Sequence, residues 1–257
     1  MARTEQMAAR IEPTEAAEFR LRQDLAALYR MAAHFGWDDL LATHISARVP
    51  GNDDAFLINP LGLMFDEVTA SNLVKVNGDG EILGHSAYGI NRAGFVIHSA
   101  VHRARPDAAC VIHLHSRNGV AVSATRAGLL PLNQTALLLG QNIGFHDFEG
   151  IAFDLDEQPR LERDLGDKHV MFLRNHGTLV LGSSIASAFA RCYSLEWACD
   201  VQVRTLGMGT ELTPVAPEAI AKVAGQTSGD FMESYAQKLL WPAMLRKMTR
   251  LDPGFAD

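Results

Sequence analysis

His113 and His115 stand in a short apolar run, CVIHLHS, and this run constrains the fold of the chain more than any other segment. Short apolar runs of this kind are typical of β-strands. Side chains two positions apart on a strand project from the same face. The two imidazoles are therefore predicted to lie side by side, an arrangement that suits a bound metal ion.

A third histidine, His176, lies in a second apolar segment, VMFLRNHGTLVLG, which we interpret as a hairpin with this histidine at its turn. The glycine that follows it, Gly177, is expected to permit tight turning of the backbone. Three histidines that leave a fourth position open are what a catalytic zinc or similar ion requires. We therefore predict a metal site formed by His113, His115 and His176.

His98 and His102 form a competing pair, four positions apart on one face of a predicted helix. Helical histidines at this spacing also occur in zinc sites. The glutamate that metalloproteases place after the first histidine is absent, because Ser99 stands there. We therefore assign His98 and His102 a structural role.

The rest of the chain alternates helical and strand-like patterns. Strand-like runs are THISARVP, AFLINP, NLVKV and NIGFH. Helical patterns cover residues 13–36, 91–105, 117–141 with a break near Pro131, 157–165, and a stripe from Ile185 through Cys192 and Cys199 to Val203. These elements favour a layered α/β domain around a largely antiparallel sheet.

The length of 257 residues and the hydrophobic content of 47% are enough for one sizeable core. We expect a polar leader over residues 1–15, a single domain over 16–250 and a tail over 251–257. The leader has no long apolar core, and no run reaches the ~18 apolar residues of a membrane-spanning helix. A cytoplasmic protein without a membrane partner is expected.

Charge and cysteine usage exclude further classes of protein. The net charge is −7 and no basic run occurs, which argues against a nucleic-acid partner. Cys110, Cys192 and Cys199 lie in apolar segments without C-x-x-C spacing, so neither a disulfide framework nor a cysteine zinc knuckle is expected. A reducing compartment fits this pattern.

Four segments carry a more specific signal: HISAR, INPLGLMFDEVTASNLVKVNGDGEI, IHSAVHRARPDAACVIHLHS and LRNHGTLVLG. Across roughly residues 20–210, they make the chain resemble the class II aldolase and adducin family. The resemblance implies a three-layer α/β/α fold with an antiparallel central sheet, and a homotetramer with sites between neighbouring subunits. It also implies that His113, His115 and His176 hold a divalent metal, most often Zn²⁺, with Mn²⁺ or Fe²⁺ as alternatives.

The chain departs from the sugar-phosphate aldolases of that family at several positions. In those enzymes, the metal chelates a ketose phosphate and stabilises an ene-diolate, and a glutamate transfers the proton. The position that matches this glutamate is Gly94, so no catalytic acid or base is assigned. Such a carboxylate is typically worth ~10² to 10⁴ in rate. Most phosphate-binding groups are also replaced, at Thr43, His44, Leu61, Gly62, Arg92 and Ala93.

His44, Gly62 and Arg92 are the candidates for substrate binding. Arg92 and His44 together offer hydrogen-bond donors for a carboxylate, although Arg92 has the alternative of solvating the start of its helix. The segment GFHDFEG, with His146, is interpreted as a polar loop. It either supplies an acid or base to a neighbouring subunit or is solvated surface.

Gly94 and Phe95 make the segment INRAGFVIHSAVHRARPD most similar to the adducin-like branch of the family. The first hypothesis is a metal-dependent lyase that acts on a small carbonyl or carboxylate compound through an enolate or ene-diolate. Decarboxylation suits Gly94, because loss of carbon dioxide needs no base, and related oxygenases use iron with dioxygen. The second hypothesis is an adducin-like, non-catalytic assembly or binding module. Retention of all three histidines favours the enzyme.

Overall fold

A seven-stranded sheet with the order β3-β2-β1-β4-β7-β6-β5 forms the centre of the computed structural model, which describes residues 13–140, 142–227 and 231–257. Neighbouring strands are antiparallel except β5 and β6, which are parallel. The largely antiparallel sheet expected from the sequence is confirmed. Its strands are β1 (His44–Arg48), β2 (Ala55–Ile58), β3 (Val74–Asn77), β4 (Cys110–Leu114), β5 (Ile143–His146), β6 (Val170–Leu173) and β7 (Gly177–Gly182).

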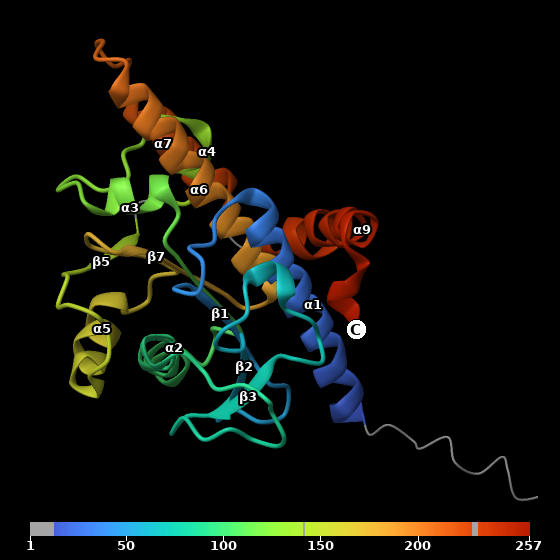
Figure 1. Ribbon diagram of the computed structural model, residues 1–257. Helices are drawn as coiled ribbons and strands as arrows, with labels where there is room; N and C mark the ends of the chain where they lie inside the picture. The colour runs from blue at the N-terminus through green and yellow to red at the C-terminus, as the bar shows by residue number, and fades with distance from the viewer. Residues whose placement is uncertain (1–12, 141, 228–230) are drawn as a thin grey trace, which may run out of the picture.

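Helices cover both faces of this sheet. The α-helices are α1 (Pro13–Phe35), α2 (Arg92–Ala104), α3 (Arg117–Ser123), α4 (Gln134–Leu138), α5 (Gln158–Leu165), α6 (Ile185–Gly207), α7 (Pro217–Gln226), α8 (Phe231–Tyr235) and α9 (Trp241–Leu251). Short 3-10 or π turns are η1 (Phe65–Glu67), η2 (Leu155–Glu157), η3 (Ala236–Leu240) and η4 (Pro253–Ala256). Figure 1 shows α2 and α5 on one side of the sheet and α1, α6 and α9 on the other. The three-layer α/β/α arrangement is therefore confirmed.

Strand β4 lies at the middle of the sheet and divides its side chains between the two cores. Cys110, Ile112 and Leu114 pack with the helices α1 and α6, whereas Val111 packs with α2 and α5. This division follows from the period of two along a strand. His113 shares the Val111 side, so its imidazole lies on the face that α2 covers.

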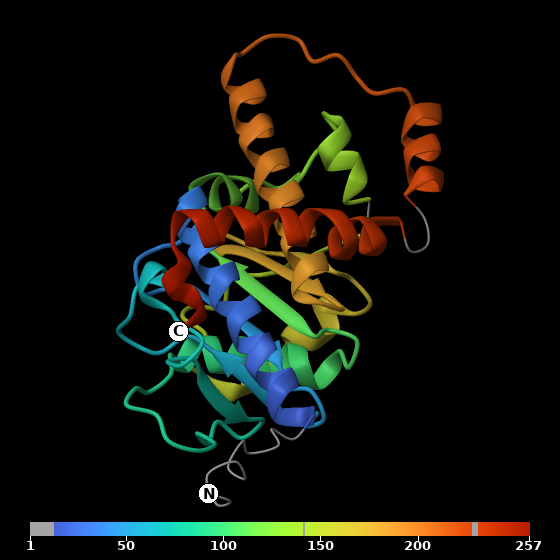
Figure 2. The same cartoon turned by 90° about the vertical axis from the view of Figure 1, so that its right-hand side faces the viewer.

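Local signals set the ends of the two helices that frame the site. The Asn91 side chain accepts hydrogen bonds from the first turn of α2, and this helix ends just before Pro106. Ser184 caps the start of α6. In α6, Cys192 and Cys199 are buried and free, as expected, but Val203 is 36% exposed. The helix predicted through Val203 is confirmed, and this residue is more exposed than the two cysteines because the end of α6 projects beyond the sheet (Figure 2).

The two ends of the chain were expected to lie outside the domain. Residues 1–12 of the expected leader lie outside the described residues, and α1 begins at Pro13. The expected tail packs on the domain: Phe255 is buried, and its carbonyl accepts from the Ala70 N–H. Among the described helices, none has both the length and the apolar character that crossing a bilayer would need.

His98 and His102 are buried on the face of α2 that contacts β1. Ser46 Oγ is 2.5 Å from His98 Nδ1 and 2.7 Å from His102 Nε2. Burial, assisted by the charge of Arg48, lowers the pKa of His102 to about 3. These contacts hold α2 against the sheet, in agreement with the structural role predicted for both histidines.

We predict that His102 makes the fold sensitive to acid. The folded chain keeps this imidazole neutral down to a pKa of about 3, whereas the unfolded chain protonates it below its ordinary value of 6.5. The unfolded state therefore binds more protons in this window, and stability falls as the pH is lowered. Between about pH 7 and pH 5, this single group should reduce the free energy of unfolding by about 2 kcal/mol.

Urea unfolding at the two pH values would test this prediction. The variant His102→Asn should lose less stability on acidification than the wild type, by about 2 kcal/mol. The matched control His34→Asn changes an exposed histidine and should keep the wild-type pH dependence. Equal pH dependence of the wild type and His102→Asn would contradict the prediction.

Candidate metal centre

Three imidazoles meet where β4 ends and β6 turns into β7. His113 lies in β4, His115 directly follows that strand, and His176 lies in the turn. The three ring centroids are 4.7 to 4.8 Å apart, and one nitrogen of each ring lies within 4.8 Å of the others. The structure thus brings together the three histidines that the sequence singled out.

The turn that carries His176 is built differently from the expectation. Asn175, not the following glycine, adopts the left-handed backbone conformation, with φ of 58°. A Cβ on Gly177 would lie 2.3 Å from the carbonyl oxygen of Leu114. The expected reason for Gly177 is therefore wrong: this glycine lets β7 approach β4 closely, and Asn175 makes the turn.

Hydrogen bonds fix the orientation of two of these rings. The Nδ1–H of His113 donates to the carbonyl oxygen of Thr178 at 3.0 Å, because a carbonyl can only accept. The Nδ1–H of His115 donates to Asp39 Oδ2 at 3.1 Å. A carbonyl or carboxylate behind the ring is the usual support of a metal-binding histidine.

The other nitrogens of these rings then face each other. The Nε2 atoms of His113 and His115 are 3.0 Å apart, and in the neutral rings both carry lone pairs. Such lone pairs repel each other unless a cation or a proton lies between them. Burial holds the pKa of His113 well below its usual range, and burial, followed by the charges of His115 and His146, lowers that of His176 to about 4. Neutral imidazoles so arranged fit a divalent ion.

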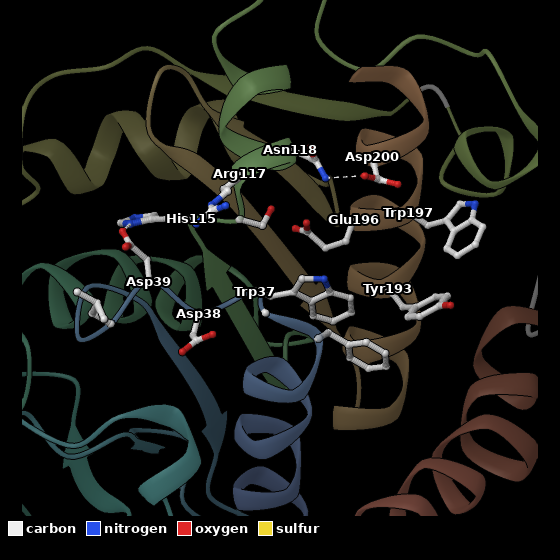
Figure 3. A pocket seen from close by; sticks show the side chains of 14 residues that line it. Trp37, Asp38, Asp39, His115, Arg117, Asn118, Tyr193, Glu196, Trp197 and Asp200 are labelled. Atoms are coloured by element: carbon white, nitrogen blue, oxygen red, sulfur yellow. Dashed lines mark hydrogen bonds and ion pairs between the residues drawn. The ribbon is translucent and has the colours of Figure 1, made fainter. Parts of the chain in front are cut away.

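A cavity of roughly 870 Å³ opens beside His115 (Figure 3). Asp39 reaches His115 from the loop after α1, and Glu196 points into the cavity from α6. Burial raises the pKa of Glu196 to about 7, although the hydroxyls of Ser116 and Thr178 lower it. Its Oε1 atom has no hydrogen-bond partner among the described residues.

Sequence reasoning missed both of these acidic residues. Glu196 carried a signal, because it stands on the buried stripe of α6, three positions before Cys199. An acidic residue in such a stripe is rare without a partner or a function. Asp39 carried a weaker signal, since only the polar sequence WDD at the end of an amphipathic helix marked it.

His44 fills the space that a side chain at position 94, at the start of α2, would occupy. A Cβ on Gly94 would lie 2.7 Å from Cδ2 and 2.9 Å from Cγ of the His44 ring. That ring also stacks on His113, with centroids 4.9 Å apart and planes at 29°. His44 and His113 are register partners on neighbouring strands, which explains this contact. Glycine at 94 and histidine at 44 are therefore sterically coupled.

Among the three substrate-binding candidates, the structure places only His44 next to the histidine cluster. Arg92 is exposed, and its Nε is 3.4 Å from the carbonyl oxygen of Phe153. Gly62 lies in the turn after β2, with φ of 97°. Within the described part of the chain, no hydrogen bond or ring contact joins Arg92 or Gly62 to His44.

His146 does not lie in a polar loop, contrary to the interpretation of GFHDFEG. It is the last residue of β5 and is 3% exposed. Its Nδ1 is 2.8 Å from Asp164 Oδ2, and its Nε2 is 3.3 Å from Glu157 Oε1. The strand-like run NIGFH had already included this residue, and α5 supplies a carboxylate that accommodates its buried ring.

We predict that the fit between His44 and Gly94 can be measured as a coupling of two substitutions. Gly94→Ala should lower the free energy of unfolding by about 1–3 kcal/mol, because the added methyl overlaps the ring. In a His44→Ala background, the same change should raise it by up to about 1 kcal/mol, since alanine favours a helix more than glycine does. Denaturant unfolding of all four proteins measures this difference.

A helical glycine with room for a methyl serves as the control. No atom lies within 4 Å of a Cβ on Gly207, so Gly207→Ala should have the same effect with or without His44. If Gly94→Ala destabilised the wild type and the His44→Ala protein equally, steric coupling between these two positions would be refuted.

Known proteins that resemble this chain fall within one family. The family model described as the Class II Aldolase and Adducin N-terminal domain matches residues 23–203. A Caulobacter vibrioides protein named "Putative aldolase class 2 protein" is 50% identical over 241 residues, which cover 94% of this chain and 93% of that protein. Alpha-adducin of Rattus norvegicus is 48% identical over 189 residues, which cover 72% of this chain and 26% of that protein.

Solved structures agree with the sequence relatives. An aldolase II superfamily protein from Pseudomonas syringae is 46% identical with a TM-score of 0.88, covering 96% of this chain and 98% of that one. An L-fuculose 1-phosphate aldolase from Glaciozyma antarctica is 28% identical with a TM-score of 0.82, covering 94% of this chain and 93% of that one. By family match, sequence identity and fold, this chain belongs to the class II aldolase and adducin family.

Proposed function

We propose that this protein is a metal-dependent lyase-type enzyme that acts on a small carbonyl or carboxylate compound. The observation that carries the proposal is the 3.0 Å approach of the Nε2 atoms of His113 and His115, whose Nδ1 atoms are both engaged. With His176, these nitrogens would hold a divalent ion, with Zn²⁺ expected first and Mn²⁺ or Fe²⁺ as alternatives. Such an ion would supply stabilisation of negative charge developing on a substrate oxygen.

The residues around the three histidines limit the type of reaction. Gly94 supplies no carboxylate, and the His44 ring occupies the space beside it. Carbon–carbon cleavage by decarboxylation needs no base to remove a proton, so it suits this site better than retro-aldol cleavage of a sugar phosphate. An oxygenase that uses Fe²⁺ and dioxygen is a further variant. Arg92 and Gly62 remain the proposed outer binding residues for the substrate.

We propose a homotetramer with sites between neighbouring subunits. The end of α6, and α7 beyond it, project from the sheet (Figure 2). Large apolar side chains of α6, of its C-terminal end and of η3 are exposed. They include Trp197 at 54%, Leu206 at 44%, Met208 at 67% and Leu239 at 64% exposure. Contact between subunits would bury such side chains. A single domain over residues 16–250 and a cytoplasmic location belong to the same proposal.

An adducin-like assembly or binding module is the second candidate. The identity of 48% to alpha-adducin over 72% of this chain favours it, although the match covers only 26% of that protein. This function requires no metal and no turnover. Turnover of a keto acid, ketose or aldehyde by the metal-loaded protein, abolished by His115→Ala, would exclude it.

Elemental analysis of the purified chain tests the enzyme proposal. We expect close to one divalent ion per chain, and loss of most of this metal in His113→Ala and His176→Ala, because each removes one of three ligands. The control His85→Ala changes an exposed histidine and should retain the wild-type metal content. Circular dichroism of each variant would establish that the fold is unchanged.

Metal content near zero in well-folded wild-type protein, after dialysis against Zn²⁺, Mn²⁺ and Fe²⁺ in turn, would contradict the proposal. Equal metal content in the wild type and His113→Ala would also contradict it, because the ion would then lie elsewhere.

A further inference from the structure

A continuous line of hydrogen bonds runs from the backbone at Ala108 to His44, through the interior between α2 and β1. His102 Nδ1 is 3.2 Å from the Ala108 carbonyl oxygen, and His102 Nε2 is 2.7 Å from Ser46 Oγ. The same Ser46 Oγ is 2.5 Å from His98 Nδ1, and His98 Nε2 is 2.9 Å from His44 Nδ1. All five residues are buried, so water does not compete for these bonds.

The direction of every bond follows from the carbonyl at one end. A carbonyl oxygen only accepts, so His102 Nδ1 carries the proton and His102 Nε2 is bare. Ser46 has a single hydroxyl proton, which it must donate to that bare nitrogen. Ser46 Oγ then accepts from the Nδ1–H of His98. His98 Nε2 is left bare in turn and accepts from the Nδ1–H of His44.

The reverse direction would place two lone pairs against each other. If Ser46 donated to His98, the Nε2 of His102 would have to be the donor. A neutral His102 would then point a bare Nδ1 at the Ala108 carbonyl oxygen, 3.2 Å away. Protonation of both nitrogens would avoid this clash, but burial lowers the pKa of His102 to about 3. Burial also holds the pKa of His98 well below its usual range, so near neutral pH His98 and His102 are uncharged. At His44, a proton on Nε2 would have no acceptor among the described residues.

The remaining nitrogen, His44 Nε2, makes no hydrogen bond with any described residue. It lies 3.1 Å from the position that a Cβ on Gly94 would occupy. Its ring is stacked on His113, one of the three clustered histidines. The bare Nε2 is thus held on a ring that contacts this cluster, in the space that a side chain at position 94 would enter.

We propose that His98, Ser46 and His102 are positioning residues that fix His44 as a hydrogen-bond acceptor for the substrate. Because this role concerns a substrate beside the metal, it rests on the proposed function. An acceptor at this place selects a ligand that presents a hydroxyl or another donor next to its metal-bound oxygen, as an α-hydroxy carbonyl compound does. The bare nitrogen disfavours a carboxylate at the same place, which replaces the expectation that His44 and Arg92 bind a carboxylate together.

Nuclear magnetic resonance of the full chain with ¹⁵N-labelled histidine tests this directly, because protonated and bare ring nitrogens have well-separated ¹⁵N shifts. We expect His44, His98 and His102 to be Nδ1–H tautomers in the metal-free protein near neutral pH. The exposed His85 serves as an internal reference for an unconstrained ring. A protonated Nε2 on His44 would overturn the proposal, whatever the metal content of the protein.

Two serine variants distinguish the effect of the hydrogen-bond line on the His44 tautomer from general effects of losing a buried hydroxyl. Ser46→Ala removes the hydroxyl that donates to His102 and accepts from His98, so His44 should become a mixture of both tautomers. Ser123→Ala removes another buried hydroxyl, which donates only within α3, and should leave His44 unchanged. An unchanged His44 tautomer in folded Ser46→Ala would show that the line does not set it. The wild-type measurement remains decisive if that variant does not fold.

Titration of the same sample with Zn²⁺ distinguishes failure of this inference from failure of the proposed function. The Nε2 signals of His113 and His115 and a ring nitrogen of His176 should shift on binding, while His44 Nε2 stays bare. If none of these histidines responds to Zn²⁺, the proposed function fails, although the tautomer of His44 is still measured. If His44 Nε2 shifts as a ligand does, His44 holds the metal, and its role as a substrate acceptor is overturned.

Discussion

The approach of two bare imidazole nitrogens, on His113 and His115, is the interaction on which the site depends. Each ring is held from behind, one by the Thr178 carbonyl of β7 and one by the Asp39 carboxylate. The central position of β4 between β1 and β7 makes both supports possible. An arrangement that brings lone pairs together costs free energy unless a cation or a proton lies between them, and this cost supports the divalent ion proposed for the site.

Hydrogen bonds also fix ring orientation in the interior, along the line from His44 to Ala108. Buried polar groups must find partners, and here each partner also sets the proton position of the next group. The role of His98 and His102 is thus structural, as the sequence predicted, and also directional. Glycine at 94 is part of this design, because any larger residue would displace His44. The absence of a glutamate at position 94 and the burial of the His44 ring therefore go together, because both side chains would need the same space.

Periodicity in the sequence was sufficient to predict the strands, the main helices and the shared strand face of His113 and His115, because these features depend on local alternation, which a single sequence reveals. That His176 joins them was predicted from the ligand number of a metal site and from the family resemblance, since 63 positions separate His113 from His176. Asp39 could not be paired with His115 in this way, because 76 positions separate them and only the folded chain joins them. The contact of His44 with Gly94 and the close approach of Gly177 to β4 have the same origin. Both depend on distances across the sheet, which residue types alone do not give.

The most direct test of the metal centre is X-ray absorption spectroscopy of the purified, zinc-loaded protein at the zinc edge. Three imidazole nitrogens should surround the metal at about 2.0–2.1 Å, with an oxygen ligand completing the sphere and no sulfur ligand. The variant His115→Ala should lose one of these imidazoles. Sulfur ligands, or a nitrogen shell that is unchanged in His115→Ala, would contradict a centre built from His113, His115 and His176.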